Sequence, residues 1–507
     1  MSSRFGVFAS AVSTGAIALI CGAPQAFAAE PAAKATVTVD PGRTLGPIKP
    51  MNAVNNGPSV KHVSGDMKSG NDVDYQLLKI PAARIHDMPI CDINRLFPDF
   101  DADETKPENY DFVFSDRYLD GIRRAGTEVF FRLGQTIEHG PKKYGVLPPK
   151  DYAKWARICE HVIRHYNEGW GWGTDTAYTT HNTAWSNQFN IVRWEIWNEP
   201  DLGHNYLRPE RNPTTWGGTV TNFFEFYEIA AKHLKGTFPK LMIGGPGAAG
   251  YDNWIEDFLA YCRDHRVPID FFSWHIYSRT TKPAVERSEF IRRTLDRCGY
   301  RKAESYLNEW NYVKGWTDDW PYTIDCESGS RRLKGAAFVS AMMTALQGTT
   351  TDMLMFYDTR PHSGMNNLFV AGSLFPAKGY YPFYAWRKLR ELGTQIASSV
   401  AEGAGVDSNA NSGFVEKKDR TTAGQFTAVA AKGRDGRLAV LVTRYSDDDN
   451  TSDTGTVTLR VAGRPITGGY AYLTDEARSF TQVPLLPCAD GSAVFFMQPL
   501  SFAYVEF

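Results

Sequence analysis

The stretch Trp194-Glu195-Ile196-Trp197-Asn198-Glu199-Pro200-Asp201 decides the fold that the sequence predicts. Its first four residues are largely apolar, which is typical of a buried strand in a parallel sheet. Pro200 ends that strand and favours an extended backbone at Glu199. In a parallel barrel, polar residues at the carboxyl end of a strand face the place where chemistry occurs. The stretch therefore predicts a barrel strand with Glu199 at its rim.

A second stretch, Ser305-Tyr306-Leu307-Asn308-Glu309-Trp310-Asn311, has the same pattern. A short apolar run again leads into a glutamate that is flanked by an aromatic residue. The same reasoning predicts a strand that ends near Glu309, with its carboxyl group at the rim of the barrel.

From about residue 48 to residue 392, short apolar runs alternate with amphipathic helical patterns. Eight of the runs are predicted to be strands: Ile48–Val54, Ala82–His86, Glu128–Leu133, Arg193–Trp197, Leu241–Gly244, Asp270–Trp274, Ser305–Leu307 and Met353–Tyr357. Strand–helix units repeated eight times predict a parallel (β/α)8 barrel, the TIM barrel. Glu199 and Glu309 end the fourth and seventh strands. We therefore expect these two carboxyl groups to face each other across the barrel mouth.

The pattern changes after Gly393, where short alternating runs and turn clusters replace the helices. This pattern predicts an antiparallel β-sandwich module. The predicted organisation is a signal peptide over residues 1–28, a catalytic barrel with a short N-terminal strand over 29–392, and the β-sandwich over 393–507.

The N-terminus has the features of a secretory signal. Arg4 precedes an uncharged run of small and apolar residues from Gly6 to Gly22, and Ala26-Phe27-Ala28 fits a cleavage site. The mature chain is expected to begin near Ala29. Export to the periplasm or the extracellular space is the expectation that follows.

Composition and motifs limit the kinds of partner that the sequence predicts. The formal net charge is −2 and charged residues make up 22% of the chain, which argues against a nucleic-acid surface or attraction to an anionic membrane. The cysteines form no C-x-x-C pair, and neither a zinc-binding His-Glu-x-x-His motif nor a complete EF-hand loop is present. We therefore expect no metal and no cofactor.

A facing pair of glutamates suits the hydrolysis of glycosidic bonds. One carboxyl group must be protonated so that it can donate to the leaving oxygen, and the other must be ionised so that it can attack the anomeric carbon. The protein has to separate the two pKa values, and the distance between the carboxyl groups decides whether configuration is retained or inverted.

The two glutamate motifs and the trailing β module resemble the clan A (β/α)8 glycoside hydrolases, and among them family 39 most. The resemblance covers nearly the whole mature chain. That family includes β-xylosidases, α-L-iduronidases and enzymes that release arabinofuranosyl units. The resemblance implies a retaining mechanism in which Glu199 is the acid/base and Glu309 is the nucleophile.

The same resemblance suggests roles for five further residues. Arg84 looks like the arginine that keeps the nucleophile ionised, and His86 beside it is a candidate ligand for a sugar hydroxyl. Asn198 resembles the residue that binds the 2-hydroxyl. His275 and Tyr277 look like the pair that flanks the acid/base and the nucleophile, respectively.

One departure affects the sugar site, because related enzymes often end the eighth strand with Trp, whereas this chain has Phe356-Tyr357-Asp358. Long loops between strands favour a pocket and hence exo action. The predicted activity is release of β-D-xylosyl or α-L-arabinofuranosyl units, or of a short disaccharide, from plant-type oligo- or polysaccharides. The alternative is a catalytically inactive carbohydrate-binding protein on the same scaffold.

Overall fold

A computed structural model describes residues 33–59, 70–171, 189–202, 213–315, 333–370, 373–402, 425–448, 451 and 453–507. The predicted signal peptide lies outside the described residues, as does Cys326. None of the described helices is both long enough and apolar enough to cross a membrane.

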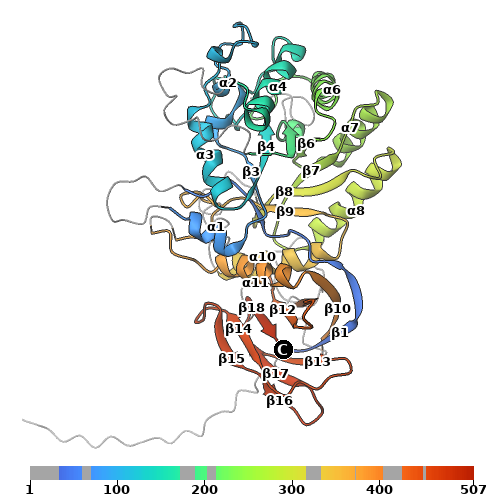
Figure 1. The fold of residues 1–507 in the computed structure, drawn as a ribbon. Coiled ribbons are helices and arrows are strands. Elements are labelled where there is room, and N and C mark those ends of the chain that lie inside the picture. The colour runs from blue at the N-terminus through green and yellow to red at the C-terminus, as the bar shows by residue number, and fades with distance from the viewer. Residues whose placement is uncertain are drawn as a thin grey trace, which may run out of the picture.

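Eight parallel strands close into a barrel in chain order, which confirms the predicted fold (Figure 1). The strands are β2 (Ala53–Asn55), β3 (Ala82–Ile85), β4 (Glu128–Leu133), β5 (Arg193–Ile196), β6 (Met242–Ala248), β7 (Phe271–Ser278), β8 (Glu304–Tyr312) and β9 (Met353–Phe356). β7 and β8 extend well beyond their predicted ends and pair with each other as far as Ser278 and Tyr312. The register between β7 and β8 shifts between Trp274 and His275, so that His275 pairs with Glu309, and the extended strands carry Tyr277 and Glu309 beyond this irregularity.

Helices surround the barrel (Figure 1). They are α1 (Asp72–Leu78), α2 (Ile93–Leu96), α3 (Val113–Arg124), α4 (Tyr152–Glu168), α6 (Val220–Thr237), α7 (Asp252–Asp264), α8 (Lys282–Arg297), α10 (Leu333–Gln347) and α11 (Tyr380–Leu392). The start of α6 is fixed by a capping box, in which Thr219 and Asn222 each bond the other's main-chain N–H. The side chain of Asp151 accepts a bond from the N–H of Lys154 and begins α4 in the same way.

Alternation along the strands divides the barrel interior into layers. At the end where the strands begin, a cluster of apolar side chains fills the interior: Ala53, Ala82, Phe130, Phe271, Tyr306, Met353 and Met355. Two residues further along, most strands have a polar side chain that points inward. These polar side chains are buried: Asn55, Arg84, Arg132, Ser273 and Asn308. The barrel is thus closed by an apolar floor below a polar layer at its carboxyl end.

The second unit is one ten-stranded, mostly antiparallel sheet. In sheet order its strands are β15 (Thr481–Pro484), β14 (Tyr470–Thr474), β18 (Ser501–Glu506), β12 (Leu438–Arg444), β11 (Phe426–Lys432), β10 (Thr394–Glu402), β1 (Lys34–Pro47), β13 (Gly455–Val461), β17 (Ala493–Met497) and β16 (Leu486–Pro487). Strands from both halves of this order share one apolar cluster, so the sheet folds over on itself.

The N-terminal strand β1 belongs to this second sheet, whereas the sequence grouped it with the barrel. It pairs antiparallel with β10 and parallel with β13. The pairing joins segments that lie hundreds of residues apart, so no local pattern in the sequence reveals it. The chain therefore starts in the β module, crosses into the barrel and returns.

The β module packs against the barrel through two helices. Side chains on one face of β11, β12 and β18, among them Leu441, Phe502 and Tyr504, belong to the same core as α10 and α11 of the barrel. A module turn also reaches the barrel, where the Tyr312 hydroxyl at the end of β8 donates to Asp447 over 2.8 Å. The end of β8 is therefore fixed from both units.

Candidate active site

Glu199 lies just beyond the end of β5, in a backbone conformation that the sequence did not predict. Its φ is +48°, and Trp197 before it has a φ of +75°. Such strain costs roughly 1–3 kcal/mol per residue and persists where the surroundings hold it. Here the main-chain N–H of Glu199 donates to the Gly247 carbonyl over 3.0 Å, and the Thr215 hydroxyl donates to the Glu199 carbonyl over 2.7 Å. The extended conformation expected before Pro200 is therefore wrong, because these tertiary bonds outweigh the local preference.

Glu309 lies within β8, and its side chain is only 5% exposed. The Tyr277 hydroxyl donates to its Oε1 over 2.6 Å, and Arg84 Nη1 donates to its Oε2 over 3.2 Å. His86 Nε2 lies 3.4 Å from the same Oε2. The Glu309 carboxylate is therefore surrounded by three other predicted site residues, Tyr277, Arg84 and His86.

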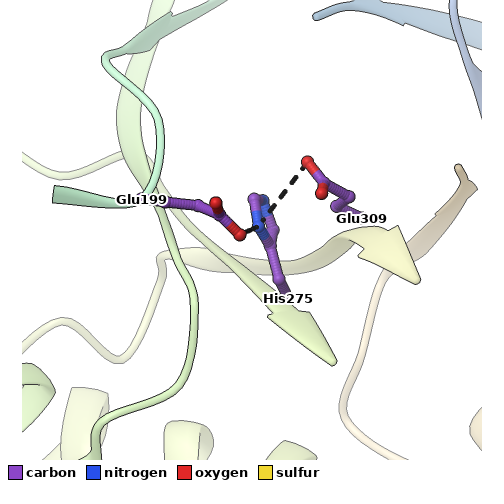
Figure 2. A group of neighbouring side chains, drawn as sticks. All are labelled: Glu199, His275 and Glu309. Carbon is purple, nitrogen blue, oxygen red and sulfur yellow. Dashed lines mark hydrogen bonds and ion pairs between the residues drawn. The ribbon is translucent and has the colours of Figure 1, made fainter. Parts of the chain in front are cut away.

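The two glutamates face each other with His275 between them (Figure 2). His275 Nδ1 is hydrogen-bonded to Glu199 Oε1 at 2.8 Å and lies 3.6 Å from Glu309 Oε2. Three atoms lie within 4.8 Å of one another: a carboxylate oxygen of Glu199, a ring nitrogen of His275 and a carboxylate oxygen of Glu309. The carboxyl groups of Glu199 and Glu309, which were predicted to face each other, are therefore close together in the structure.

Burial raises the pKa values of both glutamates. Burial, together with the nearby charges of Asp201 and Asp87, raises the pKa of Glu199 to about 8, against the opposing effect of Arg84. Burial also raises the pKa of Glu309, to about 7, where His275, Arg84 and the hydrogen bond from Tyr277 oppose it. Three groups thus favour the ionised form of Glu309, whereas the charges of Asp201 and Asp87 disfavour the ionised form of Glu199.

Arg84 connects the two halves of the site. Its Nη2 donates to Asn198 Oδ1 over 2.5 Å, while its Nη1 donates to Glu309 and to Asn55 Oδ1. Its Nε donates over 2.7 Å to Glu195, a carboxylate that is fully buried below it. The Arg84 guanidinium group thus contacts Asn198, which stands beside the acid/base candidate, and Glu309, the nucleophile candidate. It fixes the positions of these two residues relative to each other.

Several buried polar atoms of the site have no hydrogen-bond partner within the described residues. They are both ring nitrogens of His86, Nδ2 of Asn198 and Nε2 of His275. Buried polar groups are normally paired, and unpaired ones call for an explanation. Burial lowers the pKa values of both histidines, which favours the neutral ring with one donor and one acceptor. The site thus presents polar atoms suited to a ligand that is rich in hydroxyl groups.

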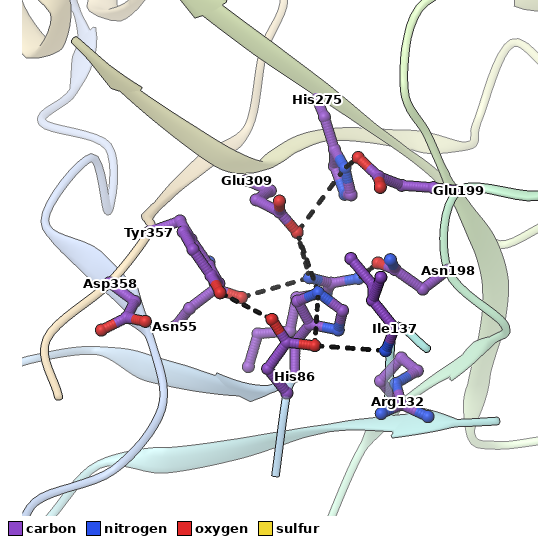
Figure 3. Close-up of polar contacts among 12 residues, drawn as sticks. Asn55, His86, Arg132, Ile137, Asn198, Glu199, His275, Glu309, Tyr357 and Asp358 are labelled. Carbon is purple, nitrogen blue, oxygen red and sulfur yellow. Dashed lines mark hydrogen bonds and ion pairs between the residues drawn. The ribbon is translucent and has the colours of Figure 1, made fainter. Parts of the chain in front are cut away.

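All seven predicted site residues meet at the carboxyl end of the barrel, and Figure 3 shows several of them around Glu309. Among the carboxylates that had no predicted role, Glu195 and Asp87 contact predicted site residues directly. Glu195 had a visible signal, because a charged side chain interrupts the apolar strand run of Trp194 and Ile196. Asp87 directly follows His86 at the end of β3 and had no distinguishing pattern.

Glu199, His275 and Glu309 also form a group whose donor atoms could reach one metal ion. The guanidinium group of Arg84 lies 3.2 Å from Glu309 and already supplies positive charge to that carboxylate. A second cation there would be repelled by the first. The donor set therefore fits acid–base chemistry better than metal binding.

A cavity of about 640 Å³ lies at the opposite end of the barrel. Its lining includes Pro81, Glu128, Arg193 and Met353, which stand where strands begin. Glu199 follows β5 and Glu309 lies in the second half of β8, at the other end of the barrel, so this cavity is separate from the site.

A (β/α)8 barrel with two buried glutamates facing each other at its carboxyl end defines a class, the barrel-type glycoside hydrolases. Within this class, the model of glycosyl hydrolases family 39 matches residues 35–295, which is more than half of the chain. The chain belongs to this family.

A curated relative from Geobacillus stearothermophilus, a β-xylosidase, is 30% identical over 184 residues. That match covers 34% of this chain and 32% of the relative, so the chain spans about a third of the relative's length. Among solved structures, a glucosidase from Croceicoccus marinus aligns with a TM-score of 0.66 at 19% identity, covering 93% of this chain and 98% of that one. An α-L-arabinofuranosidase from Thermotoga maritima aligns with a TM-score of 0.64 at 14% identity, covering 93% and 99%. These two alignments show a shared fold.

Proposed function

We propose that this protein is a retaining glycoside hydrolase in which Glu309 is the nucleophile and Glu199 the acid/base. The observation that carries the proposal is the proximity of the two carboxylates, each with an oxygen within 4.8 Å of the other. Retaining enzymes hold their carboxyl groups about 5–5.5 Å apart, whereas inverting enzymes need roughly 6.5–9.5 Å to admit a water molecule. The observed spacing favours retention.

The first step forms a glycosyl–enzyme ester. The protonated Glu199 gives its proton to the glycosidic oxygen as a carboxylate oxygen of Glu309 bonds to the anomeric carbon, and the alcohol leaves. The raised pKa of Glu199 keeps its proton available near neutral pH. Arg84 and Tyr277 stabilise the ionised form of Glu309 that this step requires.

The second step hydrolyses the ester. Glu199, now ionised, takes a proton from a water molecule whose oxygen bonds to the anomeric carbon, and the bond to Glu309 breaks. Glu199 is then protonated again and Glu309 is again a carboxylate. Two displacements restore the original anomeric configuration in the product.

Neighbouring residues suit a sugar bound between the glutamates. Asn198 Nδ2, which has no partner within the described residues, is positioned by the bond from Arg84 to its oxygen, so it can contact the 2-hydroxyl. His86 and His275 offer further donors or acceptors. Two of the three similar proteins, the β-xylosidase and the α-L-arabinofuranosidase, have names that support a pentosyl substrate, β-D-xylosyl or α-L-arabinofuranosyl, and we propose plant-type glycans as its source. The long loops support exo action.

The experiment is hydrolysis of a panel of aryl glycosides, namely β-D-xylopyranoside, α-L-arabinofuranoside and β-D-glucopyranoside, with ¹H NMR of the first product anomer. Retention is expected for the substrate that is cleaved. Replacing Glu309 with Gly should abolish turnover, and azide should restore it with an azido sugar of inverted configuration. Glu289→Gln is a matched control, since Glu289 is 61% exposed on α8. Binding of oligosaccharides without turnover of any glycoside would favour the inactive carbohydrate-binding alternative.

We also propose that the chain is exported, on the support of its N-terminal sequence alone. N-terminal sequencing of the protein recovered from outside the cytoplasm should begin near Ala29. Recovery of the full-length chain in the cytoplasm would contradict this.

A further inference from the structure

Asp87 is a third carboxylate at the edge of the site and is the most open to solvent. Its side chain is 19% exposed, against 8% for Glu199 and 5% for Glu309. It follows β3 with a φ of +50°, a left-handed conformation that points the chain away from a regular strand. The position is close to the chemistry, because His86 Nε2 lies 3.5 Å from Asp87 Oδ1 and 3.4 Å from Glu309 Oε2.

Tyr357 holds this carboxylate from the other side. The Tyr357 hydroxyl donates to Asp87 Oδ2 over 2.6 Å, and Figure 3 shows Tyr357 beside the group formed by His86 and Glu309. The Tyr357 hydroxyl therefore fixes the orientation of the Asp87 carboxylate.

Asp87 retains capacity to accept hydrogen bonds. Its Oδ1 receives a long bond of 3.4 Å from the main-chain N–H of Ile137, in addition to the bond that Tyr357 makes to Oδ2. An ionised carboxylate offers about four acceptor positions. A hydroxyl group that donates to a carboxylate forms a charge-assisted bond, which is stronger than a neutral one.

The cations around Asp87 are each bound to another acid. Arg84 pairs with Glu195, Arg132 pairs with Asp92, and Arg360 pairs with Asp358. Arg360 does reach Asp87, but it donates to the main-chain oxygen over 2.6 Å. Within the described residues, the edge of the site around Asp87 therefore carries negative charge that a sugar carboxylate would meet.

We propose that Asp87, oriented by Tyr357, accepts a hydrogen bond from a sugar hydroxyl and restricts this site to neutral sugars, so that uronic acids are rejected. The inference rests on the proposed glycosidase function and names a substrate class for it. A neutral pentosyl or hexosyl unit gains a charge-assisted bond at Asp87. A uronic acid that places its carboxylate there is repelled by like charge.

The test compares the wild type with Asp87→Asn, Asp87→Ala and Tyr357→Phe on 4-nitrophenyl β-D-xylopyranoside, on its 3-deoxy and 4-deoxy analogues, and on 4-nitrophenyl β-D-glucuronide. Asp87→Asn keeps the shape of the side chain and removes its charge. Asp264→Asn is the matched control, because Asp264 is 61% exposed on the outside of the barrel. Melting temperatures of all variants establish that they fold.

For the xyloside, kcat/KM is expected to fall roughly 10- to 100-fold in Asp87→Ala, the usual effect of losing a bond to a charged group. For the one deoxy analogue that lacks the contacted hydroxyl, wild type and Asp87→Ala should be equal within about twofold. In Asp87→Asn, the ratio of kcat/KM for the xyloside to kcat/KM for the glucuronide should fall at least about tenfold. Tyr357→Phe should reproduce part of the loss.

An equal loss on the xyloside and on both deoxy analogues would overturn the hydroxyl contact, since it would mean a structural role. An unchanged xyloside-to-glucuronide ratio in Asp87→Asn would overturn the rejection of uronic acids. Failure of the proposed function looks different: the wild type would then hydrolyse no aryl glycoside at all.

Discussion

Arg84 Nε lies 2.7 Å from Glu195 Oε2, and neither side chain is exposed to solvent. Glu195 also accepts bonds from the Ser273 hydroxyl and from Asn308 Nδ2, both at 2.6 Å. A buried carboxylate thus neutralises and orients the guanidinium group that contacts both Asn198 and Glu309. The relationship makes Glu195 a positioning residue, which acts on Glu309 and Asn198 through Arg84.

Replacing Glu195 with Gln keeps the shape of this contact and removes its charge. The positive charge of Arg84 is then no longer balanced, so the pKa values of Glu309 and Glu199 should both fall. Both limbs of the pH profile of kcat/KM should move to lower pH. The free energy of unfolding should drop by roughly 3–5 kcal/mol, because a buried charge has lost its partner.

The matched control for this prediction is Glu128→Gln. Glu128 also pairs with an arginine at 2.7 Å, but it is 62% exposed and stands at the opposite end of the barrel. Its loss should leave the pH profile unchanged. An unshifted profile in Glu195→Gln would contradict the electrostatic role of Glu195.

The wild type should show a bell-shaped pH profile that is centred between about pH 7 and pH 8. Below about pH 7 Glu309 is protonated and cannot attack, and above about pH 8 Glu199 has lost the proton it must donate. Initial rates from pH 4 to pH 10 measure the profile, and an optimum below pH 5 would refute this electrostatic account.

Tyr277→Phe should shift the acidic limb of the profile to higher pH. The Tyr277 hydroxyl bonds the carboxylate of Glu309 and lowers the pKa of that group, so its removal makes ionisation harder. We expect kcat to fall about 10- to 100-fold at pH 6, in line with loss of a bond to a charged group. A smaller loss is expected at pH 8, where Glu309 is ionised in any case. Equal losses at both pH values would speak against this role.

Glu309→Gln should make the protein more stable at pH 8 than the wild type. Because burial raises the pKa of Glu309 above its unfolded value of about 4.3, the folded state holds its proton more tightly than the unfolded state. Wild-type stability therefore declines as the pH rises from about 4.3 to about 7. A neutral Gln avoids this decline, so the melting temperature should be about 1–3 °C higher than that of the wild type at pH 8, with a smaller difference at pH 4.5. A lower melting temperature at pH 8 would contradict the prediction.

Local pattern was enough to predict the barrel. The predicted strand Glu128–Leu133 has the bounds of β4, and the two glutamate motifs fell on the fourth and seventh barrel strands, with Glu199 just beyond β5 and Glu309 within β8. Buried strands and amphipathic helices leave strong periodic signals. The seven-residue helix α1 was missed because it is too short to show such periodicity.

Contacts that depend on tertiary structure could not be predicted. The place of β1 depends on pairing with strands far along the chain, and the left-handed backbone at Glu199 depends on Gly247 and Thr215. The pairing of Arg84 with Glu195 joins two inward side chains from strands that are not neighbours. The sequence was enough to predict the two facing glutamates and five residues around them, while the contacts of the buried Glu195 and the edge residue Asp87 became visible only in three dimensions.

In the proposed mechanism, Glu309 attacks the anomeric carbon of the sugar. Incubation with a 2,4-dinitrophenyl 2-deoxy-2-fluoro glycoside of the preferred sugar slows the second step and should trap the glycosyl–enzyme ester. Peptide mass spectrometry should then find one label per chain on the peptide that contains Glu309, and pre-incubation with a competing sugar should prevent it. A label on any other carboxylate would contradict the account.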